Sequence, residues 1–540
     1  MTPTSTARLL GATALVALAA AAPARATTLG DAVAYAYATN PGLQAQRAAL
    51  RAQDESYVQA RTGYGLQISA QASFTNYDIA NSGRDQLGNP VVPSSTTDTG
   101  SQGVSLSQPI YTGGRVKARV SQAEAAIRTG RENLRRVEQD LLVRVVTAYV
   151  NVRRDEQLLR ITQDTITVLE KQLSDNLIKR GVGQLTATDI AQSQARLAQS
   201  RSTLAAVQGQ LAVSRAQYLA SVGQNPVDLQ PPPPLENLPA TIDKAFEAAE
   251  ANNPQLLSTV YSEQLSRARV AEARAARLPS ISARLDFQRS PYQIFDERFG
   301  VNDTRVGSLT FSQPIYTSGQ ISSGVRQTTE ENNRDRLNID ETRLQVTQQV
   351  ASAWEQLAAA RKQVTTYQDE VRADEFAFYG VRQEERFALR STIEVLNAQL
   401  ELTNAQQNLV RTRAQEYASR AQVLASIGVL DARLFAPDTP RYDAAANLKR
   451  VRDIGATPLE VPVRLLDGLL TPAVGPQRPA SIAVAHPGGA ELPPAPAPDA
   501  PLASILSTFD KAPPPPGPVR PTPPDPRTPP TVAAPAAKPE

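Results

Sequence analysis

The chain lacks cysteine entirely, and its 540 residues include a single histidine, His486. Without cysteine it has no disulfides, thiolate metal sites or cysteine nucleophiles. The histidine lies in a stretch rich in proline and glycine, so the sequence offers no histidine-based metal site and no catalytic triad. These absences indicate a protein that is not an enzyme and needs no cofactor.

Long apolar segments and a concentrated charge of one sign are also missing. Mean hydropathy is -0.32, whereas a bundle of transmembrane helices needs repeated apolar runs of about 20 residues. Lys and Arg number 56 against 53 Asp and Glu, which leaves a formal net charge of +3. A polytopic inner-membrane protein is therefore excluded, and nothing supports binding to nucleic acid.

One apolar run does occur, at the N-terminus. Arg8 precedes the apolar stretch from Leu9 to Ala22, and the Ala-Arg-Ala at 24–26 is typical of a cleavage site. We predict a signal peptide over residues 1–26, with a buried N-terminal helix as the alternative. An exported chain without another long apolar segment is periplasmic, secreted or an outer-membrane β-protein.

The remaining sequence contains an internal duplication. Residues 29–43 resemble residues 242–256, with an Asn-Pro in each, and the sequence SQPIY at 107–111 recurs at 312–316. The period is about 200 residues, far longer than in solenoid repeats, so we expect a duplicated domain-sized unit. The predicted boundaries are 27–230 for the first repeat, 231–240 for a proline-rich connector, 241–435 for the second repeat, 436–467 for an equatorial or periplasmic extension and 468–540 for a disordered Pro/Ala-rich tail. A PxxP ligand is the alternative for the tail.

Each repeat is predicted to fold as a helix, two strands, a long helix and a further helix. Apolar residues recur every three or four positions after Val116, and no proline interrupts residues 115–180, which predicts one helix about 100 Å long. The following helix, at about 184–222, reaches only about 58 Å, so the helix at 41–62 must cover the rest of this seam. The second repeat has the corresponding helices at about 320–386, 389–427 and 254–275.

Short alternating segments between these helices predict strands at about 65–75 and 97–108, and again at about 280–289 and 305–313. Strands of about ten residues span a bilayer when tilted. A soluble hairpin shows the same alternation, but two hairpins at matching positions of an exported chain favour the membrane. Four strands cannot close a membrane barrel, so membrane-spanning strands require an oligomer.

These features together resemble the TolC-type outer-membrane efflux and type I secretion channels. The resemblance rests on the duplicated helix-strand-strand-helix unit, the Asn-Pro and SQPIY segments, VGQLTATD at 182–189 and EVLNAQ at 394–399, and it covers about residues 28–455. It implies a mainly α fold with a β-barrel contribution. In a homotrimer, four strands per chain form a shared 12-stranded membrane β-barrel, which continues into an α-barrel tunnel of long antiparallel helices.

The resemblance implies an outer-membrane exit duct for drug efflux or type I protein secretion, with a long periplasmic extension. Such a duct is a passive conduit, gated at its periplasmic tip, and its partners are a periplasmic adaptor, an inner-membrane pump and outer-membrane lipid. The alternative is a periplasmic adaptor-like or fibrous coiled-coil protein, which shares the long seams. Adaptors usually have one hairpin and no duplicated strand pairs, which counts against this alternative. The sequence does not indicate whether the cargo is a protein or a small molecule.

The resemblance also implies functional positions at the two helix turns of the tip. Arg390 corresponds to the arginine that locks the gate, with Thr188 and Asp189 on the neighbouring hairpin as its partners. Glu394 and Asn397 correspond to the aperture ring, although the family has a second aspartate where this chain has Asn397. Glu385 occupies the position of the gate tyrosine.

The same turns are the expected contacts with the adaptor. The first contributes Val182, Gly183 and Thr186, in the V-G-x-x-T form of the family. In the second turn, Phe387, Ala388 and Ser391 hold the matching positions, and Ala388 replaces the glycine that adopts a positive φ without cost. For every residue at the tip, the alternative is an ordinary turn or a solvated helix face.

Overall fold

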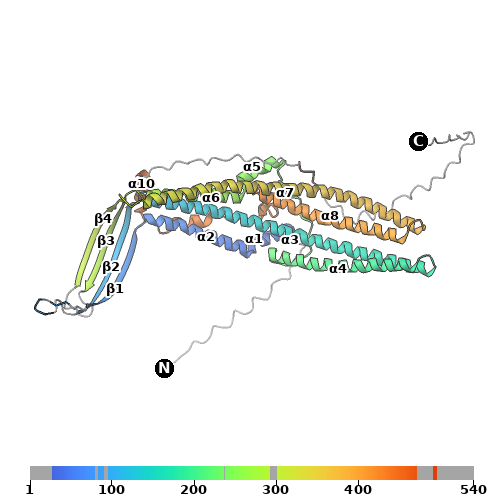
Figure 1. Cartoon of the computed structure of the whole chain (residues 1–540), viewed down its shortest axis with the longest axis horizontal. Coiled ribbons are helices and arrows are strands. Elements are labelled where there is room, and N and C mark those ends of the chain that lie inside the picture. Colours follow the sequence, from blue (N-terminus) through green and yellow to red (C-terminus); the bar gives the residue numbers. More distant parts are fainter. Residues whose placement is uncertain are drawn as a thin grey trace, which may run out of the picture. The chain divides into compact units, whose positions relative to one another are not determined.

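The computed structural model describes residues 27–79, 83–84, 86–89, 95–235, 237–291, 301–470 and 491–495. The predicted signal peptide and most of the predicted tail lie outside these ranges. All the helices and strands described below belong to a single compact unit that extends to Pro494 (Figure 1).

Apart from the short 3₁₀ helix η1, the two repeats have the same order of elements, which confirms the predicted duplication. The first consists of α1 (Leu29–Thr39), α2 (Pro41–Arg61), η1 (Thr62–Tyr64), β1 (Gln67–Ile79), β2 (Ser95–Tyr111), α3 (Arg115–Gly181) and α4 (Ala187–Val222). The second consists of α5 (Ile242–Asn252), α6 (Pro254–Ala275), β3 (Ser280–Pro291), β4 (Val301–Ser312), α7 (Gln320–Arg386) and α8 (Thr392–Ser426). The chain continues with η3 (Ala432–Leu434), α9 (Ala446–Val451) and α10 (Glu460–Leu470).

The two Asn-Pro pairs begin the second helix of each repeat. The Asn40 side chain accepts a hydrogen bond from the Leu43 N–H at 3.1 Å, and the Asn253 side chain accepts from Leu256 N–H at the same distance. Proline follows at the first helical position, where its missing N–H has no partner to lose. The duplicated dipeptide is therefore a repeated helix start.

The long helices α3 and α7 have 67 residues each and are covered by two shorter helices in succession. Helices α2 and α4 pack along α3, and α6 and α8 pack along α7 (Figure 1). Contacts of α3 with α6 and α8 join the repeats. The expected coverage of one long seam by two shorter helices is confirmed.

The largest buried side chains, Trp354, Tyr149 and Tyr218, belong to the main core. Tyr149 comes from α3, and its hydroxyl donates to the carbonyl of Thr27 at 2.9 Å and to that of Gln230 at 2.7 Å. These hydrogen bonds therefore connect Thr27, at the start of the first repeat, and Gln230, at its end, to the middle of α3. No helix in the described ranges combines the length and apolar character needed to cross a membrane.

The four strands form one antiparallel sheet in the order β1-β2-β3-β4. All four predicted strands are present, and β2 extends beyond the expected 97–108 at both ends. A bulge between Pro109 and Tyr111 marks the end of β2, just before α3. The sheet lies at one end of the long helices (Figure 1).

The segment after α8 returns to the first repeat. Helix α9 packs on α2, and α10 contacts β2, η1 and α3. Two residues of the predicted tail also make defined contacts: Leu492 packs against the main core, and Arg361 donates to the Pro493 carbonyl at 2.9 Å.

Glycines after α4 and α8 provide a test of the packing within each repeat, where the chain passes the first helix of that repeat. Gly223 and Gly428 both have positive φ, +94° and +80°, but a Cβ at Gly428 would lie 2.3 Å from the Asn252 carbonyl oxygen, whereas at Gly223 its nearest neighbour would be at 3.4 Å. Gly223→Ala should cost about 1 kcal/mol of stability through φ alone. Gly428→Ala should cost about 1–3 kcal/mol more through overpacking. Thermal unfolding of the two variants measures the difference, and equal midpoints would contradict the close approach.

Candidate functional site

The sheet has two chemically different faces. Side chains alternate along a strand, and cross-strand partners point to the same side. The apolar face carries Ile68, Ala70, Ala72, Phe74, Val104, Leu106, Ile281, Ala283, Leu285, Phe287, Leu309 and Phe311, with Gln102, Gln108, Arg289, Asp303 and Arg305 as polar exceptions. The polar face consists of Gln67, Ser69, Gln71, Ser73, Ser101, Ser105, Ser107, Arg284, Asp286, Gln288, Thr304, Ser308 and Thr310, with Val306 as an apolar exception.

The apolar face is uncovered in the single chain. Ile68, Leu309 and Phe311 are each more than half exposed. On the polar face, hydroxyls pair across the strands, with 2.7 Å between the Oγ atoms of Ser69 and Ser105. A contiguous exposed apolar surface marks contact with lipid or protein, so the two faces suit two different surroundings.

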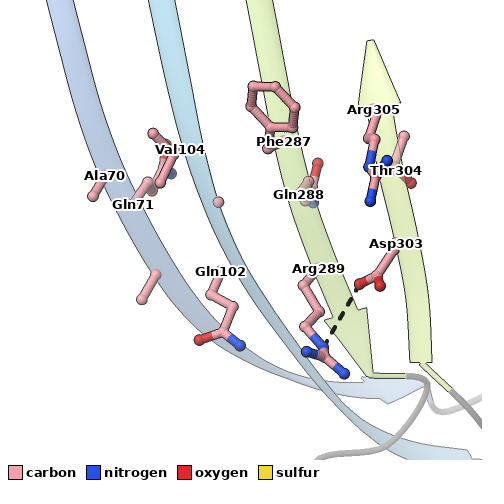
Figure 2. Close-up of a pocket in the computed structure, with 12 residues that line it drawn as sticks. Ala70, Gln71, Gln102, Val104, Phe287, Gln288, Arg289, Asp303, Thr304 and Arg305 are labelled. Atoms are coloured by element: carbon pink, nitrogen blue, oxygen red, sulfur yellow. Dashed lines mark ion pairs between the residues drawn. The ribbon is translucent and has the colours of Figure 1, made fainter.

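Charged residues bound the apolar face near the β3–β4 connection. Arg289 Nε lies 3.6 Å from Asp303 Oδ1, and Arg305 lies two residues further along β4 on the same face (Figure 2). Phe287, opposite Arg305, and these charged side chains line a hollow of about 670 Å³ over the sheet. The apolar band therefore ends before the strands do.

At the tip of the first hairpin, α3 ends and α4 begins through a tight turn. Gly183 has φ +78°, and Thr186 and Asp189 form a reciprocal cap at the start of α4. The Thr186 hydroxyl donates to Asp189 Oδ2 at 2.7 Å, and the Thr186 N–H donates to the same oxygen at 2.9 Å. These hydrogen bonds lower the pKa of Asp189. Val182 and Thr188 are exposed beside the cap.

The second hairpin repeats this turn with different residues. Ala388 takes the place of Gly183 and adopts the same left-handed conformation, with φ +58°. Ser391 and Glu394 form the cap of α8, in which the Ser391 N–H and hydroxyl each donate to Glu394 Oε2 at 2.8 Å. Phe387 is exposed at the turn. The second turn therefore keeps the same geometry without glycine, although Ala388 has a left-handed conformation that is unfavourable by about 1–2 kcal/mol for a residue with a Cβ.

Comparison with known proteins decides the family. A family model described as outer membrane efflux protein matches residues 33–224 and 245–429, which together are most of the chain. The chain belongs to the outer membrane efflux protein family. It is accordingly a protein of the outer membrane.

Individual relatives agree with this assignment. The chain is 29% identical to outer membrane efflux protein BepC of Brucella suis, over 79% of this chain and 91% of that protein. It is 24% identical to outer membrane protein TolC of Escherichia coli, over 67% of this chain and 74% of that protein. It is also 24% identical to the alkaline protease secretion protein AprF of Pseudomonas aeruginosa, over 55% of this chain and 63% of that protein.

Solved structures confirm the fold. The CusC transmembrane channel superposes with a TM-score of 0.64 at 17% identity, covering 74% of this chain and 92% of that one. The CmeC outer membrane channel of Campylobacter jejuni gives 0.65 at 15% identity, covering 78% and 88%.

In this efflux protein, the predicted latch residues have local partners within the chain. Arg390 Nε lies 2.8 Å from Glu384 Oε2, and its Nη1 lies 2.9 Å from Glu394 Oε1. Asp189 caps α4 through Thr186, so a single chain does not bring Arg390 to Asp189 or Thr188. The latch was expected between neighbouring helix pairs, and it stays a prediction.

The predicted aperture residues have different environments. The Ser391 backbone N–H is the main cause that lowers the pKa of Glu394 to about 2, and Arg390 adds to it. Asn397 Oδ1 accepts a hydrogen bond from Arg196 Nη2 of α4 at 3.2 Å. Glu394 is therefore anionic throughout the physiological range, and Asn397 joins the two hairpins of one chain.

Two tip residues were missed from the sequence. Lys179 of α3 donates to Glu385 of α7, whose side chain is almost completely buried. Arg196 of α4 reaches Asn397 of α8. Both pairs join the two hairpins, whose residues are about 200 positions apart in the chain. The one sequence signal for these contacts was that the paired residues occupy corresponding positions of the two repeats. In the described part of the chain, no cluster of three or more acidic or histidine side chains can hold a metal ion.

The two faces of the sheet generate a direct test. Phe287→Arg, and likewise Phe74→Arg, should lower the yield of assembled protein in the outer membrane, because an arginine facing lipid costs about 2–4 kcal/mol at the bilayer midplane and less toward the interface, where Arg305 already lies opposite Phe287. Gln288→Arg is the matched control, adjacent in sequence but on the polar face. Membrane fractionation measures the yield. Equal recovery of Phe287→Arg and Gln288→Arg would show that the faces are assigned wrongly.

Proposed function

We propose that this efflux-family protein is a homotrimeric exit duct, a passive conduit whose periplasmic tip opens and closes. The sheet is the observation that carries the proposal. One of its faces is apolar and the other polar, and within the described ranges the outer strands, β1 and β4, each pair with a strand of the sheet along one edge only. Backbone groups cannot remain unpaired in lipid, so the edges must pair with other copies, and three copies bring twelve strands into one closed barrel.

Closure places the polar face around a central passage and the apolar face against lipid. Hydroxyl and amide side chains then line a water-filled lumen, as in other outer-membrane barrels. The long helices α3 and α7 lead from the sheet toward the hairpin turns, which become the periplasmic end. The alternative identity considered from the sequence is a periplasmic adaptor. Adaptors usually have no second pair of strands, so that alternative does not account for β3 and β4.

The gate is proposed at the two hairpins. Arg390 holds the second turn through Glu384 and Glu394, and in the assembled trimer it would exchange these partners for Asp189 and Thr188 of a neighbouring helix pair. Lys179 and Glu385 add a second contact, within one chain. Exposed ion pairs contribute weakly, which suits a lock that a partner can reverse.

The partners are proposed to be a periplasmic adaptor and, through it, an inner-membrane pump. Val182, Phe387 and Leu389 are exposed apolar side chains on the two turns, where Gly183, Thr186, Ala388 and Ser391 shape the backbone. Apolar tips among polar neighbours fit docking against another protein. The relatives include one named for efflux and one for alkaline protease secretion, so both cargo classes fit this duct.

Removing the latch tests the gated duct. Arg390→Ala should raise the single-channel conductance or the opening frequency of the purified trimer in planar bilayers, because both local ion pairs and the expected link to Asp189 are lost. Lys179→Gln should act in the same direction. Arg386→Ala is the control, since Arg386 bonds only Gln383 at 3.4 Å in the described structure. Wild-type gating in both latch variants would contradict the proposal.

The aperture charges generate a second test. Arg390 offsets one of the carboxylates of Glu384 and Glu394, so these three side chains together carry one net negative charge per chain, and a ring of such charges attracts cations. Glu394→Gln keeps a side chain that can cap α8 but removes the charge, so block by a trivalent cation from the periplasmic side should nearly disappear. With a pKa of about 2 for Glu394, block by the wild type should be the same at pH 5 and pH 7.

Asn397→Asp should strengthen the block, since it adds a carboxylate one turn along. Arg196 would neutralise part of this new charge, so the gain should be larger when Arg196→Gln is combined with it. Block that is indifferent to Glu394→Gln and Asn397→Asp would remove both residues from the aperture.

A further inference from the structure

Helix α10 lies where the sheet joins the helices (Figure 1). It contacts β2, η1 and α3, and the link between β2 and α3 passes directly beneath its Asp467. The efflux-family match ends at residue 429, so α10 is outside the part of the chain that defines the family.

The two sides of α10 are reversed relative to an ordinary surface helix. Its buried side carries Glu460, Val463 and Asp467, which are 8%, 5% and 0% exposed. Its outer side carries Val461, Leu465 and Leu466, which are 63%, 62% and 41% exposed. Surface helices of water-soluble proteins bury the apolar side and expose the charged one.

Polar contacts hold this orientation. The Asp467 carboxylate accepts from Thr112 N–H at 2.9 Å, from the Thr112 hydroxyl at 2.8 Å and from Gly114 N–H at 3.1 Å. Glu460 lies 3.4 Å from Arg61, which also donates to the Ile454 carbonyl at 2.6 Å. A buried carboxylate with several donors is costly to displace, so the apolar side of α10 is firmly presented outward.

Hydrogen bonds place α10 on the apolar side of the sheet. Gln108 pairs with Ala283 and therefore projects from the apolar face. Its amide donates to the Tyr64 carbonyl at 2.9 Å, and the Tyr64 hydroxyl donates to Asp467 at 3.4 Å. The strand beneath α10 is β2, an interior strand, whereas a neighbouring copy would pair at β1 or β4.

Basic side chains flank the helix. Lys117 and Arg464 are exposed and, with Arg452, line a hollow of about 800 Å³ beside α10. Glu124 and Asp453 line the same hollow. An apolar helix side next to lysine and arginine is the pattern of a helix that lies in a membrane interface, with its basic groups at lipid phosphates.

We propose that α10 is an interfacial helix that inserts Val461, Leu465 and Leu466 into the periplasmic leaflet of the outer membrane, with Lys117 and Arg464 at the phosphates of phospholipid headgroups. The apolar face of the sheet and the outer side of α10 then form one continuous surface in contact with lipid. The proposal concerns the attachment of the chain to the membrane. It does not depend on the proposed gate or on the class of cargo.

The absence of native cysteine allows a single label at a chosen site. Leu465→Cys and the control Leu344→Cys, which lies on α7 and is 57% exposed, are each labelled with an environment-sensitive fluorophore. The full-length assembled protein is then placed in vesicles of phosphatidylethanolamine and phosphatidylglycerol, with or without a lipid that carries a nitroxide near its headgroup. The nitroxide should quench the label at 465 about threefold more than the label at 344, and iodide in the water should do the reverse.

Two other results would overturn the proposal. Equal quenching of both labels by iodide would mean that α10 faces water. A label at 465 that is protected from iodide but not quenched by the nitroxide lipid would mean that protein covers it, either a second copy or the C-terminal segment.

The headgroup contact has its own test. Raising the fraction of phosphatidylglycerol should increase nitroxide quenching at 465, and Lys117→Gln combined with Arg464→Gln should abolish that increase. An unchanged lipid response in the double variant would show that these two side chains do not bind headgroups.

Discussion

The outer edges of β1 and β4, which have no neighbouring strand in the described part of the chain, are the constraint on which the rest of this protein depends. In lipid, a backbone N–H or C=O without a partner costs several kcal/mol, so a four-stranded sheet cannot remain alone in a membrane. In the proposed trimer, pairing with other copies resolves this and, at the same time, gives the sheet an inside and an outside. The separation of the serine side chains from Phe74, Phe287 and Leu309 fits that closed arrangement.

The two repeats form the same turn and helix cap at the tip with different residues. Both turns keep a left-handed residue and a reciprocal cap, although Gly183 has become Ala388 and the Thr186–Asp189 cap has become Ser391–Glu394. The acidic residues assigned to the gate are thus also helix caps. Removing either one changes the start of a helix as well as a charge, which is why an amide that can still accept hydrogen bonds separates the two roles better than alanine does.

The segment after α8 connects distant parts of the molecule. It leaves the main core near Ile427, packs along α2 through α9 and ends at the base of the sheet, where Asp467 binds the link between β2 and α3. A single carboxylate therefore couples the last described helix to the point where strand becomes helix. The same contact orients an apolar helix side outward, beside the apolar face of the sheet.

Local patterns allowed the sequence to determine the long helices, the repeated Asn-Pro starts and the four strands, since each depends on residues that are close together in the chain. The duplication followed from comparing segments about 200 residues apart. The pairs Lys179–Glu385, Arg196–Asn397 and Thr112–Asp467 were decided by the tertiary structure alone. The first two form because corresponding helices of the two repeats lie side by side, and the third because the segment after α8 returns to the sheet, so residues hundreds of positions apart meet. The orientation of α10 was decided in the same way. The periodicity of α10 shows an apolar side, and surface helices usually bury that side. In this chain the buried donors at Thr112 and Gly114 bind Asp467, so the carboxylate side of α10 is buried and the apolar side faces outward.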